Sequence, residues 1–133
     1  MVFEFLIPER PVSLQTKNRA NLQAWKHFVA SEAAKTWGDG APIDSRDLQL
    51  TLVYLCGNDP VDIDNIIKPI QDALVGLVYV DDILVTDVES RRRPLTGTYD
   101  VALCPELVLQ GLASGDECVY VRVSAQPQLE DKL

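Results

Sequence analysis

The chain has 133 residues, of which 47% are hydrophobic and 24% are charged, and its formal net charge at pH 7 is −8. This length and composition are typical of one globular domain, residues 1–133, with a single core. They exclude a membrane span, because no stretch approaches the roughly 18 consecutive apolar residues that one requires, and the acidic, apolar start of the chain is not that of a signal peptide.

The first half of the chain predicts two strands and one helix. Alternating apolar side chains predict a strand over residues 2–7. Apolar residues at every third or fourth position predict an amphipathic helix over residues 18–37. Its apolar stripe includes Trp25 and Trp37, so we assign both tryptophans to the core. Residues 47–56 are rich in β-branched and aromatic side chains and predict a second strand.

The second half continues the alternation of helices and strands. Helical spacing of apolar residues begins near residue 64, because Pro69 is tolerated only in the first turn of a helix. A third strand is predicted over residues 83–91, a short helix over 105–113 and a last strand over 117–124. The predicted fold is therefore α+β, with a small mixed sheet of about four strands, two main helices and one short helix.

The negative charge is concentrated in one part of the chain. Residues 58–90 hold eight Asp and Glu residues and a single Lys, whereas the flanking segments are together nearly neutral. Like charges at this density usually mark a disordered run, but isoleucine, valine and leucine alternate with the acids throughout this window. A bound divalent cation would offset the repulsion. The chain has no large basic face, which argues against tight non-specific binding to DNA.

Two pairs of aspartates in this window are candidate metal ligands. Asp62 and Asp64 leave the same face of an extended chain, and Asp81 and Asp82 stand at the foot of the next predicted strand. An adjacent placement of that strand would bring the second pair beside the first. Carboxylates without a nearby histidine or cysteine favour Mg²⁺ and exclude a zinc site. Each residue also has a structural alternative, with Asp64 as a helix N-cap, Asp62 as loop polarity and the second pair as a turn.

Lys68 is the single base within the acidic window, one helical turn after Asp64. It either forms an i,i+4 ion pair, worth about 0.3–0.5 kcal/mol, or meets a phosphate and stabilises the charge that rises during displacement. Carboxylates, Mg²⁺ and one lysine together are the equipment of metal-assisted phosphodiester hydrolysis.

The pattern D-x-D-N-x-x-K-x-x-x-D-A-L, followed by D-D, resembles the signature of the RusA-like Holliday-junction resolvases. Its fixed positions in this chain are Asp62, Asp64, Asn65, Lys68, Asp72, Ala73, Leu74, Asp81 and Asp82. The resemblance implies a Mg²⁺-dependent homodimer that cuts four-way DNA junctions by paired nicks, in recombination and repair. It implies that Asp62, Asp64 and Asp82 are catalytic metal ligands with Asp81 beside them, and that Lys68 is the phosphate-facing cation.

Basic residues in and around the first helix and at the end of the third strand are the candidates for DNA binding. We expect these residues to hold the DNA backbone: Lys17, Arg19, Lys26, Arg91, Arg92 and Arg93. The alternative for the arginine triplet is a solvated strand end paired with local acids. His27, the only histidine, is interpreted as a surface residue and not as a general base. For the homodimer, the apolar residues 77–80 are the candidate interface.

Two other functions remain open at this stage. The chain could use the same chemistry on another branched or single-stranded nucleic acid, or it could be a catalytically silent nucleic-acid-binding protein that holds a structural cation. A Ca²⁺ sensor is excluded, because the spacing lacks the glycine and the terminal glutamate of an EF-hand loop. Cys56, Cys104 and Cys118 are in no metal-ligand spacing. We interpret them as reduced thiols of a cytoplasmic protein.

Overall fold

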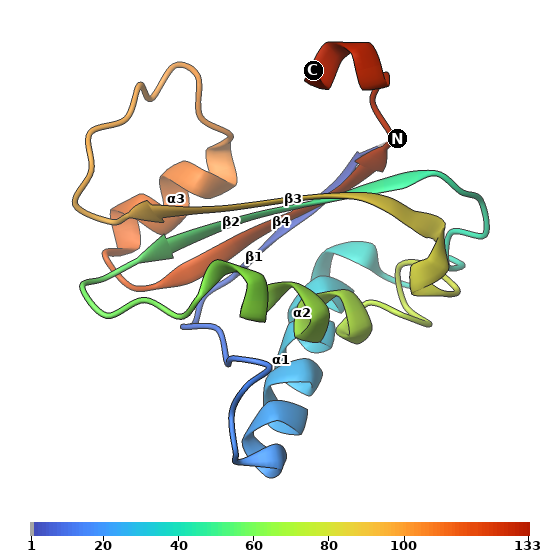
Figure 1. The fold of residues 1–133 in the computed structure, drawn as a ribbon, viewed down its shortest axis with the longest axis horizontal. Helices are drawn as coiled ribbons and strands as arrows, with labels where there is room; N and C mark the ends of the chain where they lie inside the picture. The colour runs from blue at the N-terminus through green and yellow to red at the C-terminus, as the bar shows by residue number, and fades with distance from the viewer. Residues whose placement is uncertain (1) are drawn as a thin grey trace.

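Four strands form one mixed sheet in the order β1–β4–β2–β3 (Figure 1). The computed structural model describes residues 2–133. The strands are β1 (Val2–Ile7), β2 (Leu48–Cys56), β3 (Val85–Pro94) and β4 (Cys118–Ala125). Strand β4 is antiparallel to both β1 and β2, whereas β2 and β3 are parallel. The predicted α+β fold with a four-stranded mixed sheet is confirmed.

The helices lie on both faces of this sheet. They are α1 (Arg19–Trp37), α2 (Ile67–Ala73) and α3 (Glu106–Ser114), with short 3₁₀ turns at Ile63–Ile66, Asp82–Leu84 and Leu129–Lys132. The side chain of Asn18 caps α1 by accepting a hydrogen bond of 3.0 Å from the Asn21 amide. Helices α1 and α2 lie side by side beneath the sheet in Figure 1. Within residues 2–133, no helix has both the length and the apolar character that crossing a membrane requires.

Alternate residues of the strands divide the core between the two faces of the sheet. Phe5 and Val121 belong to the larger cluster, which includes the buried faces of α1 and α2. Leu6 and Tyr120, their neighbours along the chain, belong to the smaller cluster under α3. Both tryptophans pack in the larger cluster as predicted, Trp25 buried and Trp37 against the edge of a phenylalanine ring. The three cysteines are free thiols, also as predicted.

The predicted elements match the observed ones closely, with α2 as the main exception. The chain turns helical near residue 64 as predicted, but as a 3₁₀ turn, and α2 itself has only 7 residues. It ends at Ala73 because residues 74–79 fold back, with the carbonyl of Leu74 accepting from the amides of Leu77 and Val78. Gly76 provides the left-handed backbone, φ +83°, that this turn needs.

The predicted interface at residues 77–80 is wrong for its central residues. Val78 and Tyr79 are completely buried inside the protomer. The Tyr79 hydroxyl also donates a hydrogen bond of 2.6 Å to the carbonyl of Gln71, which ties the turn to α2. Of the two flanking residues, Val80 is exposed and Leu77 packs partly against the core. The two central residues, Val78 and Tyr79, therefore belong to the core and are not available as an interface.

We expect the substitution Gly111→Ala to destabilise the fold by about 1–3 kcal/mol. A Cβ atom at this position would lie 2.7 Å from Sγ of Cys118 and 3.1 Å from Cδ1 of Leu55, both of which are buried. The control is the same substitution in a Cys118→Ala background, where the shorter contact is gone and only the contact with Leu55 remains, so the loss should be smaller and partly offset by the helix gain of about 1 kcal/mol for Gly→Ala. Urea unfolding of the four proteins measures both effects, and equal loss in the two backgrounds would contradict the proposed clash.

Candidate active site

The segment that follows β2 crosses the sheet face that carries α1 and α2, and hydrogen bonds hold it there. The amide of Val61 donates to the hydroxyl of Tyr54 on β2 at 3.3 Å. From β3, Ser90 Oγ donates to the carbonyl of Ile63 at 3.5 Å, and Arg92 donates to the carbonyl of Val61 at 3.5 Å. The residues on either side of Asp62 are thus fixed against two adjacent strands.

Asp62 and Asp64 project into solvent from this fixed segment. Asp62 has an extended backbone and precedes the 3₁₀ turn, and Asp64 lies within that turn. The alternative of Asp64 as a helix N-cap is not realised, because Asp64 lies inside the turn and the N-cap position belongs to Asp62, whose side chain makes no capping hydrogen bond. Both residues are exposed. Their carboxylates are therefore available to a ligand from solution.

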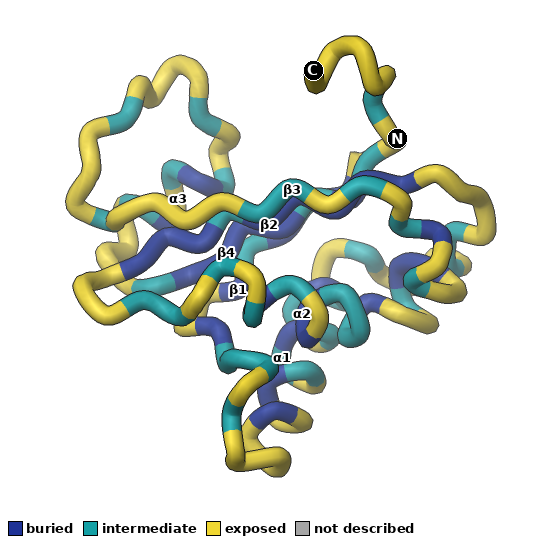
Figure 2. Tube along the Cα trace, in the orientation of Figure 1, coloured by how far each residue is buried: buried dark blue, intermediate teal, exposed yellow. Residues whose placement is uncertain are grey.

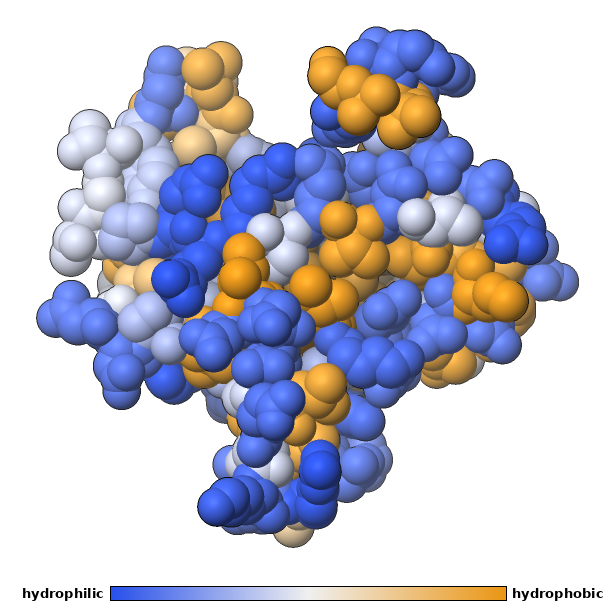
Figure 3. Space-filling model, in the orientation of Figure 1, coloured by the Kyte–Doolittle hydropathy of each residue, from blue (hydrophilic) through white to orange (hydrophobic). Residues whose placement is uncertain are grey.

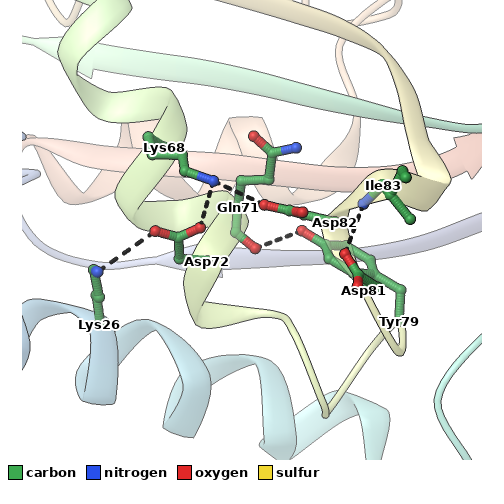
Figure 4. A network of polar contacts seen from close by, with 8 residues as sticks. All are labelled: Lys26, Lys68, Gln71, Asp72, Tyr79, Asp81, Asp82 and Ile83. Carbon is green, nitrogen blue, oxygen red and sulfur yellow. Dashed lines mark hydrogen bonds and ion pairs between the residues drawn. The ribbon is translucent and has the colours of Figure 1, made fainter.

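Lys68 lies at the centre of a charged network that joins α1, α2 and the turn before β3 (Figure 4). Its Nζ atom is 2.8 Å from Oδ2 of Asp82 and 2.9 Å from Oδ1 of Asp72. The other carboxylate oxygen of Asp72 is 3.5 Å from Nζ of Lys26 on α1. The i,i+4 partner of Lys68 is thus Asp72, on the C-terminal side, and not Asp64.

These contacts shift the ionisation of both partners. Hydrogen bonding to Lys68 lowers the pKa of the Asp82 carboxyl below its ordinary value. The pKa of Lys68 is raised, most of all by its hydrogen bond to Asp82 and secondly by its hydrogen bond to Asp72. Both side chains are in contact with solvent, 51% exposed for Lys68 and 31% for Asp82, so water screens the attraction between them. The pair is nevertheless fully charged at neutral pH.

The two neighbouring aspartates before β3 have different roles. The Asp81 carboxylate accepts a hydrogen bond of 3.0 Å from the amide of Ile83 and so caps the 3₁₀ turn Asp82–Leu84. This confirms the turn alternative for Asp81. Asp82 points instead toward Lys68 (Figure 4). The turn thereby aims one of the two carboxylates at α2.

The four predicted metal ligands do not form one group in this structure. Within residues 2–133, no three acidic, histidine or cysteine side chains are close enough together to hold a metal ion. The chemistry of the donors nevertheless fits a hard divalent cation, because exposed carboxylate oxygens are the ligands that Mg²⁺ prefers. Lys68 already places a positive charge beside Asp82. The residues fit Mg²⁺ by donor type, and Asp82 has a cationic partner of its own.

The predicted DNA-binding residues occupy two different faces of the sheet. Arg92 pairs with Tyr54 in the β2–β3 register and therefore shares the face that carries the aspartates. Arg91 and Arg93 pair with Val53 and Leu55 and project to the opposite face. Arg91 contacts Glu89 at 2.5 Å, as the local-pairing alternative expects. The triplet thus does not act as one patch.

The basic residues on α1 and just before it are also not equivalent. Lys17 and Arg19 are exposed, Arg19 as the first residue of the helix. Lys26 is only partly exposed and contacts Asp72. His27 is exposed, which agrees with its interpretation as a surface residue. Of the three predicted DNA contacts here, Lys17 and Arg19 are the more accessible.

Tyr54 is a site residue that the sequence did not single out. Its buried side chain reaches from β2 to the segment before Asp62, and its hydroxyl also bonds to the Glu117 carboxylate, which in turn accepts from Arg10 at 2.9 Å. Burial, reinforced by the bond to Glu117, raises the pKa of Tyr54 to about 12. The alternating pattern of β2 could have suggested a buried tyrosine, but no sequence spacing relates Tyr54 to Glu117.

Comparison with known protein families gives a match over most of the chain. Residues 9–99 match the model of the family described as Endodeoxyribonuclease RusA. The match includes α1, β2, α2 and β3, and with them both aspartate pairs and Lys68, whereas β1, α3 and β4 lie outside it. No curated protein gives a significant match to the chain.

Replacing Lys68 by methionine should raise the pKa of Asp82 back toward its ordinary value, because the largest cause of its depression is the hydrogen bond to Lys68. The pKa of Asp82 is lower in the folded protein than in the unfolded chain. The Lys68–Asp82 pair therefore stabilises the fold at any pH above the unfolded-state pKa of Asp82, and this stabilisation is lost as the pH falls through its folded-state pKa. A carboxyl ¹³C NMR titration measures the pKa directly. Lys26→Met is the matched control, because Lys26 contacts Asp72 and not Asp82; a similar Asp82 pKa in both variants would contradict the assignment.

Proposed function

The chain belongs to the RusA endodeoxyribonuclease family, and from this premise we propose that it is a Mg²⁺-dependent endonuclease that resolves four-way DNA junctions by paired nicks. The family match supports the assignment of nuclease activity. The observation that carries the finer proposal is the pair of exposed carboxylates, Asp62 and Asp64, on a segment anchored to two strands. The Lys68–Asp82 ion pair lies on the helix and turn that follow this segment. The proposed role is in DNA recombination and repair in the cytoplasm.

Each residue of the proposed site has a distinct task. Asp62, Asp64 and Asp82 would hold the Mg²⁺ ion, with Asp81 shaping the turn that presents Asp82. When bound, the ion supplies an activated water and a Lewis acid for phosphodiester hydrolysis. The anchoring of the segment by Tyr54 and β3 limits how far the first two carboxylates can move, which is the preorganisation that such a site needs.

Lys68 is the proposed phosphate-facing cation. Its side chain is 51% exposed although it contacts two carboxylates, so its ammonium group can reach an approaching phosphate without leaving a buried pocket. Asp72 holds the same ammonium group from the next turn of the helix and is itself held by Lys26. We propose that Asp72 keeps Lys68 beside the site when a bound cation takes over Asp82.

DNA contacts are proposed for the basic residues on the active-site side. Arg92 shares the sheet face of Asp62, and Lys17 and Arg19 are exposed at the start of α1. They would position the phosphate backbone and carry no sequence information.

A four-way junction has two-fold symmetry, and two coordinated nicks require two active sites related by a matching axis. We therefore propose that the acting unit is a homodimer.

One observation favours a second candidate function. A catalytically silent or differently targeted nucleic-acid-binding protein of the same fold would need no preformed group of three carboxylates, and residues 2–133 contain none. Junction cleavage by the parent protein, and its loss in Asp64→Asn, would distinguish a nuclease from this alternative.

We expect Asp64→Asn to reduce junction cleavage by about 100-fold or more, because it removes one charged ligand from a site whose metal supplies several kcal/mol of barrier reduction. The fold should be unchanged, since Asp64 is exposed. The assay uses labelled four-way junctions with Mg²⁺, and circular dichroism checks folding. Asp59→Asn is the control, because it removes an exposed acid from the same window but outside the motif. Cleavage by Asp64→Asn at the rate of the parent protein would overturn the metal-site proposal.

The junction should bind weakly in EDTA and more tightly in Ca²⁺, without cleavage in either. Residues 58–90 have a net charge of −7, which must be neutralised in part before a phosphate backbone can approach. Fluorescence anisotropy titrations at one ionic strength measure the two affinities. The gain from Ca²⁺ should be smaller in Asp64→Asn than in Asp59→Asn. Equal affinities in EDTA and Ca²⁺ would mean that the acids do not face the DNA.

A further inference from the structure

Strand β3 has one edge that pairs with no strand within residues 2–133. It is the last strand in the sheet order, and β2 occupies its other edge. Most of its residues are exposed or half-buried, and it appears in yellow and teal along its length in Figure 2. An open edge of 10 residues presents a row of unpaired backbone groups, which is a template for another strand.

The charges on β3 follow a definite order. The register with β2 places Asp87, Glu89, Arg91 and Arg93 on the same face of the sheet, opposite to α1 and α2. Along this face the charges run negative, negative, positive, positive. A strand with this order is complementary to a second copy of itself that runs in the opposite direction.

Two of these charges have no partner of opposite sign in the protomer. Among residues 2–133, no basic group lies within 4.0 Å of the Asp87 carboxylate, which accepts a hydrogen bond from Gln126 at 3.2 Å. Arg93 donates to the carbonyl of Arg92 at 2.9 Å and likewise contacts no acid. Both side chains are therefore able to pair with a charge on another molecule.

We propose that β3 pairs antiparallel with β3 of a second copy, with Ser90 opposite the partner's Ser90. This register places Asp87 opposite the partner's Arg93 and Glu89 opposite the partner's Arg91, and the two-fold axis repeats both pairs. Shifting the centre to Glu89 would set two glutamates against each other, and shifting it to Arg91 would do the same with arginines. Only the register centred on Ser90 satisfies all four charges, and opposite charges in directly facing positions stabilise a pair of strands.

The character of this surface agrees with such an interface. The face of the molecule in Figure 3 is largely hydrophilic, with apolar residues in small groups. Association through backbone hydrogen bonds and ion pairs needs no broad apolar patch. Charged residues on an edge strand also serve to prevent pairing, but prevention requires no particular order of signs. The self-complementary order on β3 is what favours a second copy as the occupant.

This interface rests on the proposed function, because it specifies where its homodimer forms. The axis of an antiparallel strand pair is perpendicular to the sheet, so the α1 and α2 faces of both copies would lie on the same side. Ser90, at the axis, donates its hydroxyl proton to the carbonyl of Ile63, between the two exposed aspartates. Both Asp62–Asp64 segments would then flank the axis on the side that a junction approaches.

Charge exchange at the outer pair tests the interface. The single variants Asp87→Arg and Arg93→Asp each set like charges opposite each other twice, and should weaken self-association by about 10-fold or more. The double variant Asp87→Arg/Arg93→Asp restores complementarity and should dimerise like the parent protein. A mixture of the two single variants should form a heterodimer, because all four outer charges are then paired. Sedimentation velocity at several concentrations measures each case, with circular dichroism as the check on folding.

The possible results distinguish a failure of the β3 interface from a failure of the proposed function. A parent protein that dimerises but is insensitive to both single variants overturns the β3 interface and leaves the homodimer intact. A parent protein that is monomeric at tens of micromolar overturns both. Failure of the double variant and of the mixture to regain association, with folding intact, also overturns the charge register. Junction cleavage by Asp64→Asn reports on the active site independently, because that substitution leaves β3 unchanged.

Discussion

The parallel pairing of β2 and β3 is the constraint on which the rest of the structure depends. Parallel neighbours cannot be joined by a tight hairpin, so the chain must leave the sheet after β2, cross one face and return to the same end. Residues 57–84 make this crossover and contain α2. Every proposed catalytic residue lies on it. The candidate site is therefore built from a connection that the sheet topology makes obligatory, and it is positioned by the two strands that the connection joins.

The crossover keeps many like charges near each other, and specific contacts make this tolerable. Asp82 and Asp72 share the ammonium group of Lys68, and Asp72 also contacts Lys26. Asp81 accepts a backbone amide. Asp62 and Asp64 are left in solvent, where water screens them at little cost. The acids that lie between the elements are thus paired, whereas two of the three proposed metal ligands, Asp62 and Asp64, are exposed. The apolar residues between them supply the burial that holds α2 against the sheet and α1.

Periodicity predicted most of the fold because apolar spacing and burial coincide in this chain. The strands and α1 were located to within a few residues, since their apolar faces determine both the pattern and the packing. The end of α2 was not predictable, because it depends on a backfolded turn at Gly76. The run at residues 77–80 looked like surplus apolar surface, yet Tyr79 is buried with its hydroxyl bonded inside the protomer. Apolar composition shows that a segment will be buried, but not against which partner.

For the candidate site, spacing predicted the residue types but not which of them meet. Lys68 has an acid four residues away on either side, Asp64 and Asp72. Sequence spacing does not decide between them, whereas in the fold Lys68 contacts Asp72 together with Asp82, which the turn before β3 brings close. The arginine triplet shows the same limit more clearly. Consecutive residues on a strand point to opposite faces, so Arg92 shares the face of the aspartates while Arg91 and Arg93 share the face of Glu89. One strand can therefore serve two partners at once. Its helix-side face anchors the proposed catalytic segment, and its other face carries a charge order that is complementary to a second copy of itself. In the proposed dimer, the basic residues are therefore divided between DNA and the interface, although the chain as a whole is acidic.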